Sequence, residues 1–538
     1  MPREEKSVKG IGFYCIMALL SAAAPFCLAL AWPPYDFPYL IWIGFAPLYF
    51  VLKRTSWLVS ILLVFLSGIV YYLLLLDWVA TFHRTFALPF ITVASTLGSW
   101  LPALLLSKPV IEKKPLAGFL IIPAIWVLFE YLKIQGFLGF AFGIVGYGLY
   151  EMKELIQFSE ATGIWGASFL ICAVSYLVFY LTDRIVIEKK SVKKPAIFIP
   201  AMVVIITVVG LMIFGAARMN GKPVYSQFEV GLIQTDIPEE LKWNVDQGLI
   251  WAEIDNLLSL TVQFKPAILF LPENTVKTPI SMNPYVKGGG IEEIVAKLSN
   301  MAITQKSYIL LGSGELTVSN STLLEHNSAC LFSPDGRFID AYRKNRLVPF
   351  GEYFPYGDTL PFVEEILKET GTHMFIPGGD EKKTLAFTYS NMSYPFGALI
   401  CFEGTFGYLS AGMVQNGARF LVNITCDSWA GSDTAMEQHA VFGVFRAIEN
   451  RVSFIRVGNG GKTCLIDPWG RVLNSLDLNT SSAAVTRIVF YPGAEPTMYN
   501  LYGDWFVLLA LIGIGGWGIF IGIRLVIKKG REKPAPKD

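Results

Sequence analysis

Charged side chains, histidines and cysteines are all scarce in this sequence. Asp, Glu, Lys and Arg make up 16% of the 538 residues and leave a net charge of +1, with four histidines and seven cysteines. There is no dense basic patch and no RNA-binding signature, which excludes the common nucleic-acid-binding classes. The cysteines form no close-spaced framework, and no His or Cys pair has the spacing of a zinc site. We therefore expect no nucleic-acid partner, no metal and no other cofactor.

Apolar residues, in contrast, make up 53% of the chain and are concentrated in long runs. A helix needs about 20 such residues to cross the hydrocarbon core of a bilayer. Eight runs approach this length, namely 11–32, 38–52, 57–76, 86–106, 117–132, 165–182, 196–216 and 505–527. The first run could also be a cleaved signal peptide, but it ends in Trp32-Pro33-Pro34 without a clear small-residue cleavage site, and more spans follow. The sequence therefore predicts a polytopic α-helical membrane domain.

The basic residues predict how these spans are oriented. If the N-terminus is cytoplasmic, 18 Lys and Arg residues lie in inside segments and only 3 in the short outside loops. Because cytoplasmic loops carry an excess of Lys and Arg, this count places the segment before the last span outside the cytoplasm. We expect a seven-span transmembrane domain over 1–216, an outside domain over 217–504, a transmembrane helix over 505–527 and a cytoplasmic basic tail over 528–538.

The outside segment, of about 290 residues, is long enough for one large core. Short apolar runs predict buried strands at 228–234, 267–271, 308–312, 329–332, 398–401, 420–425, 453–457 and 463–466. Helical patterns lie between several of them, at 249–264, 291–302 and 434–450. This alternation predicts a layered α/β domain.

Three chemically reactive side chains follow strand-like runs in this segment. Glu273 stands in Leu-Pro-Glu-Asn, and Cys401 follows Gly-Ala-Leu-Ile. Lys344 is separated by two residues from the motif Leu-Val-Pro-Phe-Gly-Glu that follows it. A carboxylate, an amine and a thiol supply a general base, an oxyanion-stabilising cation and a nucleophile for acyl transfer. The backbone N–H of Phe402, just past the thiol, is a plausible second oxyanion donor. The sequence therefore predicts an enzyme that acts beside a membrane.

Each of these residues also has a simpler explanation. A lone Pro-Glu such as that at Glu273 is typical of an ion-paired surface carboxylate, and Lys344 could belong to a solvated basic loop. Cys426 is an alternative nucleophile because it too ends a strand-like run, beside a carboxylate. His439 is more simply a hydrogen-bonded, partly buried histidine than a catalyst. The joint occurrence of carboxylate, amine and thiol favours the catalytic interpretation.

The same residues resemble a known family. The Glu, Lys and Cys set, with Leu-Val-Pro-Phe-Gly-Glu after the lysine, is similar to the nitrilase (carbon–nitrogen hydrolase) superfamily, and specifically to the apolipoprotein N-acyltransferases of bacterial inner membranes. The resemblance covers nearly the whole chain. Further similar segments are Gln234-Thr235-Asp236-Ile237-Pro238, Asp427-Ser428-Trp429, Gln438-His439 and Arg446-Ala447-Ile448-Glu449-Asn450-Arg451. The lysine motif is the most specific of them.

This resemblance implies an αββα sandwich that faces the periplasm. It also implies transfer of an acyl chain from a phospholipid donor to the α-amine of a diacylglyceryl-modified cysteine on a lipoprotein acceptor. By resemblance, Glu273 is the general base, Lys344 stabilises the oxyanion and Cys401 carries the acyl thioester. Glu352 and Glu403 match further acidic positions of the family.

Other positions match the family or depart from it. By resemblance, Trp243 lies over the mouth of the active site. Phe402 stands where a tyrosine is usual, Ala141-Phe142 replaces a Pro-Trp pair, and Leu501 replaces a basic residue. These changes bear on donor-lipid fit and acceptor docking and leave the three catalytic positions intact.

A membrane-tethered nitrilase-type amidase is the alternative function. It would use the same three residues, with water in place of the amine acceptor. An apolar surface that binds membrane lipid would distinguish the two, and the aromatic segment 349–363 is suited to an acyl chain. The same segment could instead pack its aromatic side chains inward.

Overall fold

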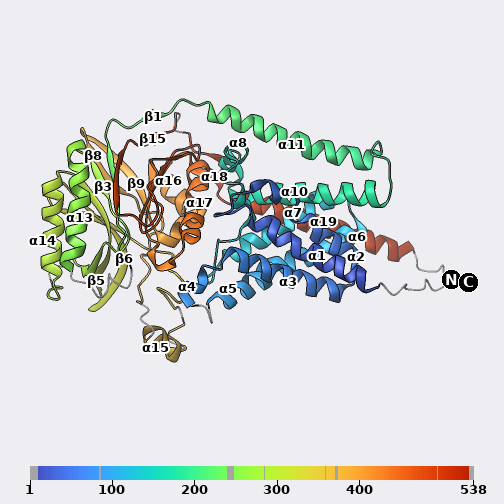
Figure 1. Cartoon of the computed structure of the whole chain (residues 1–538), viewed down its shortest axis with the longest axis horizontal. Helices are drawn as coiled ribbons and strands as arrows, with labels where there is room; N and C mark the ends of the chain where they lie inside the picture. The colour runs from blue at the N-terminus through green and yellow to red at the C-terminus, as the bar shows by residue number, and fades with distance from the viewer. Residues whose placement is uncertain are drawn as a thin grey trace, which may run out of the picture.

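The chain folds into a helical bundle joined end to end with a β-rich domain (Figure 1). The computed structural model describes residues 10–83, 87–238, 247–283, 285–354, 356–357, 359–369, 373–492 and 495–531. Helix α1 begins and helix α19 ends at the same end of the bundle, away from the β-rich domain (Figure 1).

The bundle consists of helices from both ends of the chain. Its elements are α1 (Ile11–Ala29), η1 (Pro38–Ile43), α2 (Ala46–Arg54), α3 (Trp57–Leu75), α4 (Val79–His83), α5 (Ala87–Ser95), η2 (Thr96–Trp100), α6 (Leu101–Lys113), α7 (Gly118–Lys133), η3 (Val145–Leu149), α8 (Lys153–Ile156), α9 (Ser159–Thr162), α10 (Ile164–Leu181), η4 (Thr182–Ile187), α11 (Pro195–Met219), α18 (Met498–Tyr502) and α19 (Trp505–Arg531). The long helix α11 runs beside the bundle and exposes most of its length (Figure 1).

Six segments within the described residues are long and apolar enough to cross a membrane. They are Ile11–Ala29, Trp57–Leu75, Ala87–Lys113, Ile164–Ile187, Pro195–Met219 and Trp505–Arg524. They correspond to six of the eight runs expected from the sequence. The run 38–52 is divided between η1 and α2, which starts again with a proline in its first turn, a position that favours a helix start. The run 117–132 forms α7, a largely buried helix of 16 residues.

Two sheets face each other in the β-rich domain. One has the order β13 (Val472–Leu473), β12 (Cys464–Ile466), β11 (Ser453–Asn459), β10 (Phe420–Cys426), β9 (Met392–Ile400) and β8 (Leu385–Tyr389). The other has the order β14 (Ser482–Thr486), β2 (Val230–Gln234), β3 (Ile268–Phe270), β5 (Tyr308–Ser319), β6 (Thr322–Phe332) and β7 (Phe338–Arg343), with β4 (Val276–Ile280) beside β5. A small pair is formed by β1 (Val224–Tyr225) and β15 (Val489–Phe490).

The central strands of both sheets are parallel and buried. Strands β9, β10 and β11 run parallel in one sheet, and β2, β3 and β5 in the other. Every residue of β2, β3, β10 and β11 is buried, as expected for strands covered on both faces. The ring of Phe270 on β3 lies 6.0 Å from that of Phe396 on β9 and 6.3 Å from that of Phe420 on β10, so the two sheets share one core.

Helices cover the outer face of each sheet and complete an αββα sandwich. Helices α13 (Gln247–Thr261) and α14 (Ile291–Gln305), with the short η5 (Val262–Phe264), lie on the side away from the bundle (Figure 1). Helices α16 (Gly407–Gln415) and α17 (Asp433–Asn450) lie between the other sheet and the bundle, and α15 (Pro361–Glu369) projects away from the sheets at the lower edge of the view (Figure 1). Helix α17 is buried at most of its positions because the sheet covers one side of it and the bundle the other.

Candidate active site

The candidate site lies where central strands of both sheets end. Glu273 follows β3 at the carboxyl end of the strand, the edge where ligands bind in parallel α/β sheets. Its Oε1 accepts hydrogen bonds from Asn327 Nδ2 at 2.7 Å and from Lys344 Nζ at 3.2 Å, and its Oε2 accepts one from the backbone N–H of Cys426 at 3.0 Å. The carboxylate is therefore fixed at both oxygens and buried.

Lys344 follows β7 and is 1% exposed. Its ammonium group lies 3.2 Å from Glu273 Oε1 and 2.8 Å from Glu352 Oε1. Burial alone would lower the pKa of Lys344, but the two carboxylates and the nearby Cys401 together raise this pKa well above its usual value. The side chain therefore stays protonated at neutral pH, which suits a fixed cation and excludes it as a general base.

Glu352 holds the loop that carries Lys344. Its Oε1 accepts from Lys344 and, at 3.1 Å, from Asn327 Nδ2, while its Oε2 accepts from the backbone N–H of Val348 at 2.8 Å. One carboxylate thus fixes both the lysine and the turn that follows it.

Cys401 begins the short helix η6 (Cys401–Thr405) directly after β9. Its φ of +49° lies in the left-handed region, which is uncommon for a residue other than glycine. Burial raises the pKa of its thiol well above the usual value, Glu273 raises this pKa further, and Lys344 opposes the shift. The resting thiol is therefore neutral and needs a base before it can attack.

Glu403 connects the strand that leads to Cys401 with the loop that carries Lys344. Its Oε1 accepts from the hydroxyl of Tyr342 at 2.9 Å and from the backbone N–H groups of Asn345 at 2.8 Å and Arg346 at 3.0 Å. Its Oε2 accepts from the backbone N–H of Ile400 at 2.9 Å. Burial raises the pKa of Glu403 to about 7, although these backbone donors oppose the shift. Its contacts indicate a role in holding the two loops together.

Asn327 is a site residue that the sequence reasoning missed. It lies within β6, is fully buried, and donates from one amide nitrogen to both Glu273 and Glu352. The available signal was the polar run His326-Asn327-Ser328 directly before the apolar, buried end of the strand at 329–332. A buried amide in such a position needs a polar partner.

A second polar cluster lies behind Cys401. The ligand atoms of Cys401, Asp427 and His439 lie within 4.8 Å of one another. Arg456 already forms an ion pair with Asp427. Burial would raise the pKa of Asp427, but Arg456 and His439 hold this pKa well below its usual range. Two cations, Arg456 and Lys344, act on this region, so the charges do not favour a bound metal ion.

Aromatic side chains connect the site to the bundle. The ring of Phe402 lies 6.4 Å from that of Phe140, which follows α7, and Trp78 contacts both Phe142 at 5.2 Å and Trp429 at 5.9 Å. Phe402, the residue after Cys401, therefore faces the membrane domain. Trp243, which was expected over the mouth of the site, lies outside the described residues.

Segment 349–363 is partly packed and partly exposed. Phe350 contacts Phe137 of the membrane domain, with ring centroids 5.5 Å apart. Tyr356 also contacts Phe137 but remains 52% exposed, and Phe362 on α15 is 59% exposed. Some side chains of this segment therefore pack inward, and others remain exposed as a surface suited to an acyl chain.

Comparison with known proteins identifies the family. Residues 24–177 match the model of the apolipoprotein N-acyltransferase N-terminal domain, and residues 229–490 match the carbon-nitrogen hydrolase model. The apolipoprotein N-acyltransferase of Geobacter metallireducens is 31% identical over 93% of both chains. Apolipoprotein N-acyltransferase 1 of Treponema denticola is 28% identical over 97% of this chain and 99% of its own. An amidase from Nesterenkonia sp. has 16% identity and a TM-score of 0.34 over 52% of this chain and 93% of its own.

The chain belongs to the apolipoprotein N-acyltransferase family. Membership of this family makes it an enzyme of the acyltransferase class, as the sequence predicts. It also confirms the expected fold class, a polytopic helical membrane domain with a nitrilase-like α/β domain.

The three positions that, by resemblance, were expected to depart from the family pattern lie in different settings. Phe402 contacts Phe406, with ring centroids 5.0 Å apart, and so occupies an aromatic cluster. Phe142 is buried against Phe442 at 4.9 Å. Leu501 is exposed on α18. The first two are therefore packed between the domains, and the third faces outward.

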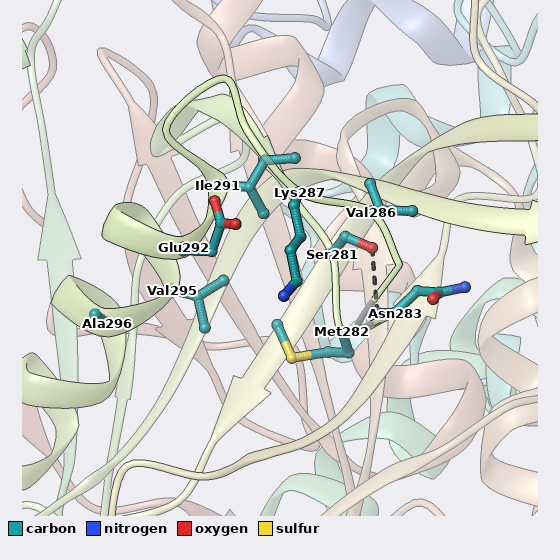
Figure 2. A pocket seen from close by; sticks show the side chains of 9 residues that line it. All are labelled: Ser281, Met282, Asn283, Val286, Lys287, Ile291, Glu292, Val295 and Ala296. Atoms are coloured by element: carbon teal, nitrogen blue, oxygen red, sulfur yellow. Dashed lines mark hydrogen bonds between the residues drawn. The ribbon is translucent and has the colours of Figure 1, made fainter.

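Two surface pockets of the protein lie away from the predicted site. Figure 2 shows one of about 340 Å³, between the segment after β4 and the start of α14, lined by Ser281, Met282, Asn283, Val286, Lys287, Ile291, Glu292, Val295 and Ala296. The other, of about 500 Å³, lies between α13 and α14. Neither is lined by a predicted catalytic residue, so we assign no chemistry to them.

Proposed function

We propose that this protein transfers an acyl chain from a phospholipid, through a thioester on Cys401, to the α-amine of the diacylglyceryl-cysteine at a lipoprotein N-terminus. The observation that carries this proposal is the pairing of Lys344 with Glu273 and Glu352 in a buried site beside Cys401. The contact between Phe402 and Phe140 supports a lipid donor, because it joins the site to the membrane domain.

In the first half-reaction, Glu273 takes the proton of the Cys401 thiol, and the sulfur attacks the carbonyl carbon of a phospholipid ester. Negative charge develops on the carbonyl oxygen, where Lys344 and the backbone N–H of Phe402 stabilise it. Collapse of the intermediate breaks the ester C–O bond. Glu273 returns its proton to the leaving lysophospholipid alkoxide, and the acyl group remains on sulfur as a thioester.

In the second half-reaction, the α-amine of the acceptor attacks the thioester carbonyl carbon. Glu273 accepts a proton from the amine, Lys344 again faces the oxyanion, and the C–S bond breaks as the amide forms. The proton returns to the thiolate of Cys401, which restores the resting enzyme. The buried, neutral thiol and the permanently charged lysine support this division of roles.

We place the catalytic domain in the periplasm and the helices in the bacterial inner membrane. The proposed boundaries are those expected from the sequence, with seven spans in 1–216, the catalytic domain in 217–504, one span in 505–527 and a cytoplasmic tail in 528–538. The excess of basic residues in the inside segments supports this orientation. So does the position of the start of α1 and the end of α19 at the bundle end away from the sheets.

The test uses the purified full-length protein, a phospholipid with an isotope-labelled acyl chain and a synthetic diacylglyceryl-cysteine peptide. Mass spectrometry should show a third, labelled acyl chain on the peptide α-amine, and Cys401→Ala should abolish this gain. Release of labelled free fatty acid with no change in the peptide, or release of ammonia from an added amide, would favour the amidase and overturn the proposal.

A further inference from the structure

The carbonyl oxygen of Cys401 accepts two side-chain hydrogen bonds. Asn423 Nδ2 on β10 lies 3.1 Å from it, and His439 Nε2 on α17 lies 3.2 Å from it. Left-handed backbone at a residue with a side chain costs of order 1 kcal/mol or more, and it persists only where its surroundings fix it. These two contacts are therefore suited to hold the nucleophile in its conformation.

Four buried side chains close a ring of hydrogen bonds through this carbonyl. His439 Nδ1 lies 3.0 Å from Asp427 Oδ1, and Arg456 donates to Asp427 Oδ2. Arg456 also donates to Asn423 Oδ1 at 2.7 Å, and Asn423 Nδ2 donates to the carbonyl of Cys401, which closes the ring. The ring links β10, β11, α17 and the start of η6. Its members restrain one another, so the position of His439 depends on Asp427.

The two partners of His439 are both hydrogen-bond acceptors. A carbonyl oxygen and an ionised carboxylate only accept, so both contacts together require a proton on each ring nitrogen. Burial lowers the pKa of His439, Arg456 lowers it further, and Asp427 opposes the shift. A neutral ring would keep only one of the two hydrogen bonds. The contributions of the two ring nitrogens can therefore be separated by experiment.

The residue beside His439 is fixed to the membrane domain. The indole N–H of Trp78 donates to Gln438 Oε1 at 3.0 Å. Gln438 Nε2 donates to the backbone carbonyls of Pro33 and Leu75, each at 3.2 Å. Two segments of the bundle, around Pro33 and at 75–78, thus meet one buried amide on α17. The same turn of the helix contacts the bundle through one side chain and the nucleophile through the next.

We propose that His439 is a positioning residue whose Nε2–H holds the carbonyl of Cys401, and that Gln438 sets its position from the membrane domain. This inference rests on the proposed function, in which Cys401 is the nucleophile. The docking of the two domains then determines how the thiol is presented to a phospholipid ester. His439 itself touches neither donor nor acceptor and acts only through Cys401.

Two amide variants separate the two ring nitrogens. The Nε2 of a glutamine matches the His439 Nε2 position and can still donate to the Cys401 carbonyl, whereas the shorter Asn amide matches Nδ1 and reaches only Asp427. Thioester formation is followed with phospholipid alone, and alkylation of Cys401 by iodoacetamide is mapped by mass spectrometry. We expect H439N to slow both rates by about tenfold with the donor KM unchanged, because the Cys401 carbonyl loses one of its two side-chain hydrogen bonds. We expect H439Q to stay within about threefold of wild type.

His326 provides the matched control. It is also buried, and its ring nitrogens lie 3.0 Å from Thr317 Oγ1 and 2.8 Å from the carbonyl of Ile376, away from Cys401. H326N should therefore leave the alkylation rate of Cys401 at the wild-type value. Equal rates for H439N and H439Q, or a wild-type rate for H439N, would overturn the positioning role.

Gln438→Leu tests the connection to the membrane while leaving His439 in place. It should slow alkylation of Cys401 by about three- to tenfold, a size typical of coupling mutations, and an unchanged rate would overturn the part assigned to Gln438. Alkylation needs no lipid, so it separates this inference from the proposed function. If wild type forms no thioester, the proposed function fails. If wild type forms it and H439N forms it equally fast, only the positioning role fails.

Discussion

The backbone N–H of Cys426 donates a hydrogen bond to Glu273 Oε2 at 3.0 Å. Cys426 ends β10, next to the end of β9, where Cys401 begins η6. The residue that competes with Cys401 as a nucleophile in the sequence therefore contributes through its backbone and helps to fix the predicted base. Replacing the side chain of Cys426 leaves this N–H in place, so substitutions can test the thiol of Cys401 and the thiol of Cys426 separately.

The first prediction concerns the nucleophile. With phospholipid and no acceptor, the protein should accumulate a hydroxylamine-sensitive acyl thioester that mass spectrometry maps to Cys401. Cys426→Ala should retain it because the backbone N–H that binds Glu273 remains, Cys464→Ala should retain it because Cys464 lies on β12, and Cys401→Ala should abolish it. Glu273→Gln should slow its formation, since the neutral thiol then lacks a proton acceptor.

An adduct on Cys426, or acyl transfer by Cys401→Ala, would contradict this mechanism and leave the membrane architecture untouched.

The second prediction concerns Lys344. Lys344→Met removes the cation that faces the developing oxyanion and should lower acylation by about 10²- to 10³-fold. It also leaves Glu273 and Glu352 without their shared cation, so the thermal midpoint should fall as well. Rates are therefore compared per folded protein, as measured by size-exclusion chromatography in detergent. Lys383→Ala, which breaks only the pair with Asp340, should retain normal rates.

Acylation by Lys344→Met within about threefold of wild type would assign the lysine a purely structural role.

The third prediction concerns the close approach of β5 to the base. A Cβ on Gly312 would lie 2.4 Å from Glu273 Cα and 2.7 Å from the backbone N of Asn274. Because both are backbone atoms, Gly312→Ala should displace the base, slow thioester formation by about tenfold or more, and destabilise the fold by about 1–3 kcal/mol. Gly314→Ala on the same strand meets the movable carboxylate of Glu325 at 2.8 Å and should be tolerated. Equal rates for the two variants would contradict this argument.

Glu273, Lys344 and Cys401 can be singled out from the sequence because each follows an apolar run. Glu273 and Cys401 follow strands of different sheets, β3 and β9, so the sequence predicts each strand end, and the packing of the two sheets brings these ends together. Asn327 could not be found in this way, because its partners Glu273 and Glu352 are 54 and 25 residues away and its amide lies within a strand. Hydrogen-bond partners that lie far apart in the chain leave no periodic signal.

The same limit applies to the junction of the two domains. Trp78 and Gln438 are 360 residues apart and form a buried hydrogen bond between the domains. Hydropathy measures how apolar a run is and takes no account of helix continuity. It therefore predicted the six long helices well, whereas the run 38–52 contains the break between η1 and α2.

The fourth prediction follows from the pKa of Glu403, which burial raises from 4.5 to about 7. Between these values the native state holds a proton that the unfolded chain has released, so the free energy of unfolding falls as pH rises through this window. Each unit of such a shift corresponds to about 1.4 kcal/mol. The thermal midpoint in detergent should therefore fall between pH 4.5 and 7, and Glu403→Gln should lack this component. The exposed Glu293→Gln should keep the wild-type profile. Identical slopes for wild type and Glu403→Gln would refute the assignment.

The fifth prediction concerns orientation, which decides whether the catalytic domain lies in the periplasm. Lys53 and Arg54 on α2 pair with Asp183 on η4. Glu188 pairs with both Lys53 and Arg184, so basic residues of two inside segments meet in one ion-paired cluster. With 18 basic residues on the expected inside against 3 outside, the positive-inside rule places this cluster in the cytoplasm. A reporter that is active only outside the cytoplasm should therefore be active when fused after Lys222 and inactive when fused after Lys190. Because α11 alone separates these two positions, the pair of fusions tests one crossing, and the opposite pattern would place the catalytic domain in the cytoplasm.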